Sequence, residues 1–64
     1  MSLQYIRQHY KVPAKRGDKV LAKTPSGELT YGTIIGASGP HLQVRFFGED
    51  RVVLYDPKDV EYCR

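Results

Sequence analysis

Clusters of glycine and proline divide the chain from residue 17 onward into short runs. The clusters are Gly17-Asp18, Pro25-Ser26-Gly27, Ser38-Gly39-Pro40, Gly48-Glu49-Asp50 and Asp56-Pro57. They favour tight turns, because proline presets φ for the second turn position and glycine adopts positive φ at little steric cost. Short runs between turn signals, rich in β-branched and aromatic residues, are typical of antiparallel β structure.

The runs between these turns predict strands over residues 19–24, 29–37, 41–47, 51–55 and 60–63. In the third run, Leu42, Val44 and Phe46 occupy alternate positions, and we expect these three side chains in the core because successive residues of a strand face opposite sides. Glycine inside a strand often marks a bend or bulge, which we expect at Gly32 and Gly36. Residues 56–59 predict a single 3₁₀ turn before the last strand.

Residues 2–10 predict a short helix. Ser2 is a suitable N-cap, and Leu3, Ile6 and Tyr10 follow at helical spacing. Pro13 prevents the helix from continuing. A helix this short is marginal alone, so we expect its apolar stripe to dock on the β domain. The chain thus divides into a lead-in, 1–14, and a β domain, 15–64.

The length of 64 residues allows one domain with a thin core. Cys63 is the only cysteine, so no disulfide forms within the chain, and Cys63, His9 and His41 lack the spacing of a zinc site. We therefore predict no metal, and stabilisation by self-association or by the docked lead-in. A lone cysteine and the lack of a long apolar run predict a cytoplasmic protein without membrane contact.

Positive charge is concentrated in the first third of the chain. Residues 1–23 hold six lysines and arginines against Asp18 alone, a balance of +5, whereas residues 24–64 hold four against six acids, a balance of −2. The candidate nucleic-acid contacts are Lys11, Lys15, Arg16, Lys19 and Lys23, with Arg45 and Phe47 on the third strand. Such a cluster binds the DNA or RNA backbone without reading sequence. The alternative is a solvated charged face that keeps the protein soluble.

Three aromatic residues, Tyr31, Phe46 and Phe47, form a second candidate site, for a protein partner. Aromatic cages bind methylated lysine or arginine through cation–π attraction. We expect Tyr31 and Phe46 in the core, because a small domain needs large side chains there. Phe47 shares the face of Arg45, where it stacks on a base, contacts a protein, or is covered by the helix or a second subunit.

No set of residues predicts catalysis or a cofactor. Ser2, Ser26 and Ser38 lie in the lead-in or in turns, with no histidine and acid at the spacing of a catalytic triad. The acid pairs Glu49-Asp50 and Asp56/Asp59 lie in turns, and neither pair suits acid–base chemistry. We therefore expect a non-enzymatic binding module.

The segment 17–23 (GDKVLAK), followed by Gly27 and by 31–36 (YGTIIG), resembles the opening of SH3-like modules of the KOW and Tudor kind. This resemblance implies a mostly β, five-stranded SH3-like antiparallel barrel. The chain also resembles a family of short uncharacterised bacterial and prophage-encoded proteins, in residues 5–7 (YIR), Tyr10, 12–14 (VPA), Gly17, 32–34 and 42–45. That family ends in a His-Pro turn, which here is Asp56-Pro57, and it implies no function.

The chain also resembles the plasmid-borne type of dihydrofolate reductase, an SH3-like barrel whose four copies enclose a pore for folate and NADPH. The likeness lies in the G-D-x-V opening and in the late strand 52–55 (VVLY). In this chain Val53 stands at the position of the pore glutamine, and the pore lysine falls at Ala22, beside Lys23. The resemblance therefore implies a reductase-like oligomer that lacks key pore residues, and fold likeness alone carries no chemistry.

Overall fold

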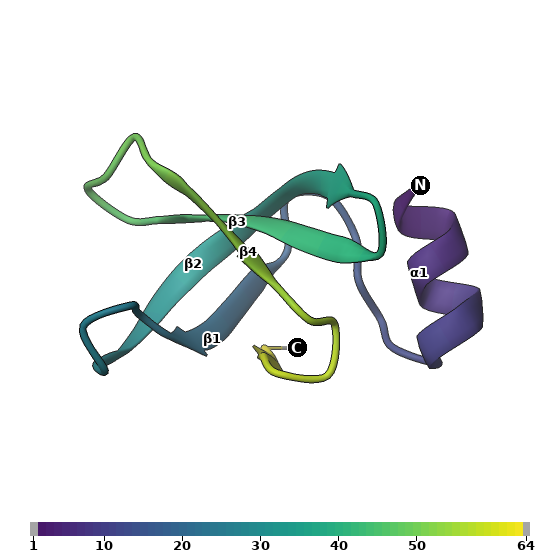
Figure 1. The fold of residues 1–64 in the computed structure, drawn as a ribbon, viewed down its shortest axis with the longest axis horizontal. Coiled ribbons are helices and arrows are strands. Elements are labelled where there is room, and N and C mark those ends of the chain that lie inside the picture. The colour runs from purple at the N-terminus through teal and green to yellow at the C-terminus, as the bar shows by residue number, and fades with distance from the viewer. Residues whose placement is uncertain (1, 64) are drawn as a thin grey trace.

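The computed structural model describes residues 2–63 and contains one helix followed by five strands (Figure 1). The elements are α1 (Leu3–Tyr10), β1 (Lys19–Lys23), β2 (Leu29–Ser38), β3 (His41–Phe46), β4 (Val52–Tyr55) and β5 (Glu61–Tyr62). The prediction of a mostly β chain with one short N-terminal helix is confirmed, and every strand lies within its predicted run to within one residue.

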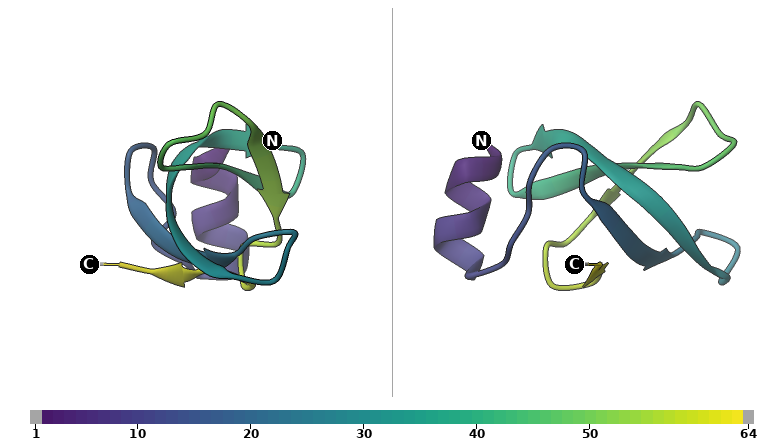
Figure 2. Two further views of the ribbon diagram at one scale, coloured as in Figure 1. Left: turned by 90° about the vertical axis from the view of Figure 1, so that its left-hand side faces the viewer. Right: turned by 180° about the vertical axis from the view of Figure 1, so that it is seen from behind.

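The strands form a single antiparallel sheet in the order β4-β3-β2-β1-β5. The sheet curls strongly, so that its strands surround a common axis when viewed along the molecule (Figure 2, left). It remains open, because the edge strands β4 and β5 do not pair within residues 2–63. Between these two strands, the backbone N–H of Asp59 donates to the carbonyl of Asp56 at 2.9 Å, which makes the predicted turn.

The inner face of the sheet carries the core. The buried apolar residues are Ile6, Ala14, Val20, Ala22, Ile34, Leu42, Val44, Phe46 and Val60. In β1 and β3 the buried residues alternate with more exposed ones, as a strand with one solvated face requires. The core placement expected for Leu42, Val44 and Phe46 is confirmed.

Tyr31 lies outside the core, so its predicted burial is wrong. It is 47% exposed, whereas Phe46 is 2% exposed. Gly32 and Ile34 are the inward residues of this part of β2, and strand alternation turns Tyr31 to the other face. At Gly32 a Cβ atom would lie 2.7 Å from Cγ1 of the buried Val44, so the strand and the core meet closely at this position.

A β-bulge in β2 changes which residues face inward. The register between β2 and β3 shifts between Ile34 and Gly36, which confirms the irregularity predicted from the strand glycines. After the shift, Gly36 lies opposite Gln43 on the outer face, and Ala37 lies opposite the buried Leu42. The bulge thus lets one long strand contribute to the core on both sides of a bend.

Helix α1 covers one end of the curled sheet, beside the turn that joins β2 to β3 (Figure 1). Ser2 caps it, accepting a hydrogen bond from a helix backbone N–H at 3.2 Å, and Lys11 ends it in the left-handed conformation at φ 60°. Ile6 is fully buried, and Leu3 and Tyr10 pack against the core. The predicted docking of the apolar stripe is confirmed. This helix, the one helix in residues 2–63, is far too short to cross a membrane.

Candidate functional site

The outer face of the sheet brings together cationic residues that are distant in the sequence. Strand pairing places Lys19 opposite Thr33, Thr33 opposite Arg45, and Arg45 opposite Val52. These four residues form one row across β1, β2, β3 and β4. Neighbouring strands lie about 4.8 Å apart, so the backbones of Lys19 and Arg45 are separated by roughly 10 Å with Thr33 between them.

Tyr31 stands beside this row and contacts its first lysine. The Lys19 Nζ atom lies 4.9 Å from the centroid of the Tyr31 ring, which is within the range of a cation–π interaction. Across the ladder Tyr31 faces Leu21 of β1. The exposed ring therefore holds a lysine side chain over the outer face of β2.

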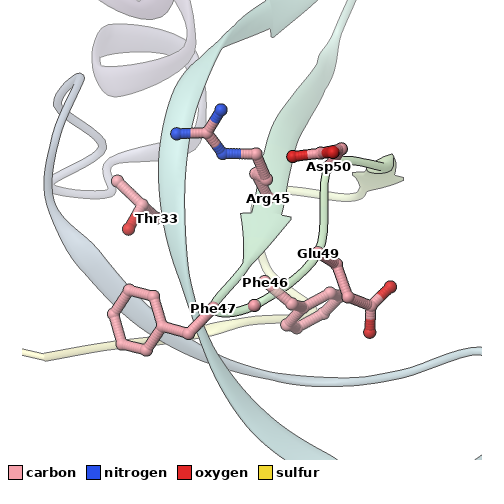
Figure 3. Close-up of a pocket in the computed structure, with 7 residues that line it drawn as sticks. Thr33, Arg45, Phe46, Phe47, Glu49 and Asp50 are labelled. Atoms are coloured by element: carbon pink, nitrogen blue, oxygen red, sulfur yellow. The ribbon is translucent and has the colours of Figure 1, made fainter.

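Phe47 follows the last residue of β3 and is 61% exposed. Continuing the β2–β3 register one step beyond the Gly32–Phe46 pair places Phe47 beside Tyr31. Phe46 and Phe47 point to opposite sides of the strand (Figure 3). Helix α1 lies at the far end of the sheet from the β3–β4 turn, so the helix does not cover Phe47 (Figures 1 and 3).

An open hollow of about 500 Å³ adjoins Phe47. Thr33, Arg45, Phe46 and Phe47 line it together with the turn 48–50. The side chains of Arg45 and Phe47 flank Thr33 in this hollow (Figure 3). Within residues 2–63 the one ion pair joins the exposed Arg51 to Glu49 at 3.6 Å, so the Arg45 guanidinium is free of ion pairing there. We name the set Lys19, Tyr31, Thr33, Arg45 and Phe47 the outer-face cluster.

The other four predicted basic residues do not lie together. Arg16 belongs to the frame of the outer face, since its Nη1 donates to the carbonyl oxygen of Ile35 in the bulge at 2.7 Å. Lys23 lies at the far end of β1, beside a second hollow that Lys58 also lines.

Lys11 and Lys15 are placed elsewhere. Lys11 ends helix α1, and Lys15 lines a separate hollow with Pro13, Asp18 and Cys63. The predicted basic segment 11–23 is therefore not one surface.

The three aromatic residues predicted as a protein-binding site do not form a cage. Phe46 packs inward, where its ring meets the Tyr55 ring edge-on at a centroid distance of 6.1 Å. Tyr31 and Phe47 remain on the outer face. An aromatic cage needs several rings around one cation, and the alternation of β3 sends one of the three candidates into the core.

The sequence does not predict the places of two residues, Thr33 and Lys58. Thr33 separates Lys19 from Arg45, and only the strand register could have shown this. Lys58 joins Lys23 because the turn before β5 folds back toward β1. No sequence signal predicts that approach, since it depends on the path of the whole chain.

Two tyrosines away from the outer-face cluster have raised pKa values. Burial, with the nearby Asp56 carboxylate, raises the pKa of Tyr62 to about 12, and its hydroxyl donates to the carbonyl of Pro57 at 2.7 Å. Burial also raises the pKa of Tyr55, whose hydroxyl donates to the carbonyl of Lys23. Both tyrosines have structural partners, so neither is poised for proton transfer.

The two positions that the reductase resemblance would assign to the pore, Ala22 and Val53, are apolar and face inward. Ala22 is buried, and Val53 packs against the core opposite Val44. Within the described part of the chain, no three His, Cys, Asp or Glu side chains gather closely enough to hold a metal ion.

No protein-family model, curated protein or solved structure matches the chain.

Proposed function

We propose that this protein is a small, non-enzymatic binding module that contacts the backbone of nucleic acids through the outer-face cluster. The observation that carries this proposal is the in-register row of Lys19, Thr33 and Arg45, with the exposed rings of Tyr31 and Phe47 beside it. Cations interleaved with exposed aromatic rings suit a ligand that combines phosphates with bases.

Few cations take part, so the binding is weak. The contacts are made to the phosphate backbone, so the binding is independent of base sequence. Lys19 and Arg45 supply the two charges, whereas Lys23 and Lys58 line a separate hollow together with the acids Asp59 and Glu61. Each neutralised phosphate releases counterions, which makes the affinity fall as salt is added. Two such contacts predict that log Kobs falls against log salt with a slope between about −1.4 and −1.8.

We propose in addition that the curled sheet is an SH3-like barrel. The strand order β4-β3-β2-β1-β5 and the single turn before β5 support it. We also propose that the chain is related to the short bacterial and prophage-encoded family, and that the protein is cytoplasmic. The free thiol of Cys63 suits a reducing compartment.

The proposed function is tested with two double variants of equal charge change. Lys19→Gln with Arg45→Gln removes the central cations, and Lys11→Gln with Lys15→Gln removes two that lie elsewhere. Fluorescence anisotropy of a labelled oligonucleotide, measured over a range of salt, should show a strong loss of affinity and a shallower salt slope for the first pair only. Equal losses for both pairs, or no binding by the unaltered protein at low salt, would refute the site.

A second candidate function is self-association through β4. This strand is an edge of the sheet and exposes Val52 to 40% and Leu54 to 51% on the outer face. Unprotected edge strands pair readily with other strands. Sedimentation equilibrium should then show a dimer that Leu54→Lys disrupts, and a monomer at all protein concentrations would exclude this alternative.

A further inference from the structure

We infer that the ligand of the outer-face cluster is a single strand of nucleic acid, with one base stacked on Phe47 and its phosphates near Arg45 and Lys19. This inference rests on the proposed function and specifies its ligand. It assigns different tasks to the two exposed rings, since Phe47 stacks on the base while Tyr31 positions Lys19.

The difference between the rings follows from their contacts. The Lys19 Nζ lies 4.9 Å from the centroid of the Tyr31 ring, so a face of that ring already has a partner. Phe47 is 61% exposed, and no aromatic or cation–π contact involves its ring within residues 2–63. A base that stacks on Phe47 therefore displaces no aromatic or cation–π contact of that ring within residues 2–63.

Stacking on Phe47 requires a base with a free face. In a duplex each base is stacked and paired, and it must be flipped out before a side chain can cover it. In a single strand the bases are available, and base–aromatic stacking is largely independent of base identity. The exposed Phe47 ring thus favours a single strand.

The surroundings of Phe47 also disfavour a duplex. The hollow beside the ring is lined on one side by Arg45 and Thr33, and on the other by the turn residues Glu49 and Asp50. The cation attracts one phosphate backbone, whereas the Asp50 carboxylate repels a second backbone placed next to it; the Glu49 carboxylate is paired with Arg51 at 3.6 Å. The outer face of the curled sheet is also convex (Figure 2), and a flexible strand follows a convex surface more closely than a rigid cylinder does.

The inference is tested by converting Phe47 into a fluorescent reporter. The chain contains no tryptophan, so Phe47→Trp introduces a single indole at the proposed stacking position. The matched control is Tyr5→Trp, an exposed aromatic position on α1 at the other end of the sheet. Each variant is titrated with DNA and RNA single strands of about eight nucleotides, and with duplexes of the same length, at about 50 mM salt.

Single strands of both kinds should quench the indole emission of the Phe47→Trp variant, and duplexes should bind at least about tenfold more weakly. Emission of the Tyr5→Trp control should not change. Quenching by DNA alone or by RNA alone would show that the sugar is also read. Equal affinity for single strands and duplexes would overturn the inference and leave the proposed function standing, whereas no binding of either would overturn both.

Anisotropy with labelled single strands tests the two rings without relying on the reporter. Phe47→Leu should weaken binding about 5- to 140-fold, the range expected for loss of one stacked base. Tyr31→Leu should weaken it less and make the salt slope shallower, and Tyr31→Phe, which keeps the ring under Lys19, should restore both. An unaltered affinity in Phe47→Leu, or a failure of Tyr31→Phe to restore binding, would refute the assigned tasks.

Discussion

Truncation of Ile6 should release the N-terminal helix from the sheet and destabilise the whole domain. Ile6 is fully buried, although it belongs to a helix of eight residues that is too short to be stable alone. Ile→Ala in a core costs about 2–5 kcal/mol. A domain of this length has a total stability of about 3–10 kcal/mol, at roughly 0.05–0.15 kcal/mol per residue. A loss near 3 kcal/mol would lower Tm by about 12–24 °C.

The measurement is urea unfolding followed by circular dichroism, with exposed Gln4→Ala on the same helix as the control. Alanine has the highest helix propensity, so both substitutions favour the isolated helix and only the loss of packing distinguishes them. Ile6→Val should cost about 0.5–1.5 kcal/mol, between the control and Ile6→Ala. A free energy of unfolding for Ile6→Ala within about 0.5 kcal/mol of the control would refute the docking of α1.

Gly32→Ala should destabilise the protein by about 1–3 kcal/mol in urea unfolding, because the added methyl would meet the buried Val44 at 2.7 Å; a stability gain would refute this close packing. Arg16→Gln should cost about 1 kcal/mol through loss of the hydrogen bond to the Ile35 carbonyl and speed amide hydrogen exchange around the bulge; unchanged exchange would contradict that role. Tyr62 has a higher pKa in the folded protein than its ordinary 10.0, so its contribution to stability is complete below pH 10 and is lost as the pH rises toward 12. Tyr62→Phe should therefore lose less stability than the unaltered protein between pH 9 and 12, and parallel losses in urea midpoints would count against this assignment.

The helix and the strands could be predicted because the local sequence signals of each element agree with one another. Helix α1 is defined without reference to the rest of the fold by its N-cap Ser2, by the spacing of Leu3, Ile6 and Tyr10, and by a following proline. Turn signals bounded all five strands in the same way. When capping, periodicity and turn chemistry agree in this way, the secondary structure of a short chain can be predicted from its sequence.

Which side chains of β2 face the core was harder to predict, because the sequence pattern of this strand is ambiguous. Ile34 and Ile35 are adjacent, so alternation alone does not say which one is buried, and the bulge reverses the alternation after this point. The size of Tyr31 predicts a core position, which the structure does not show. The inward position is instead filled by Gly32, whose missing side chain leaves room for Val44.

The outer-face cluster could be predicted only in part. Arg45 and Phe47 share a face of one strand, and alternation is enough to show that. The row from Lys19 to Arg45 depends on the register of three strands, which no local pattern specifies. Lys11 and Lys15 are near Lys19 in sequence, yet Lys11 lies at the end of α1 and Lys15 lines a separate hollow.

An NMR titration of ¹⁵N-labelled protein with a short single-stranded oligonucleotide, at two salt concentrations, tests the central claim most directly. Binding through the outer-face cluster predicts amide shifts centred on Lys19, Tyr31, Thr33, Arg45 and Phe47 that weaken at the higher salt concentration. Amides of α1 should not shift. Shifts centred on α1 or on Lys15, or an unchanged spectrum at low salt, would contradict the assignment of this face to nucleic-acid binding.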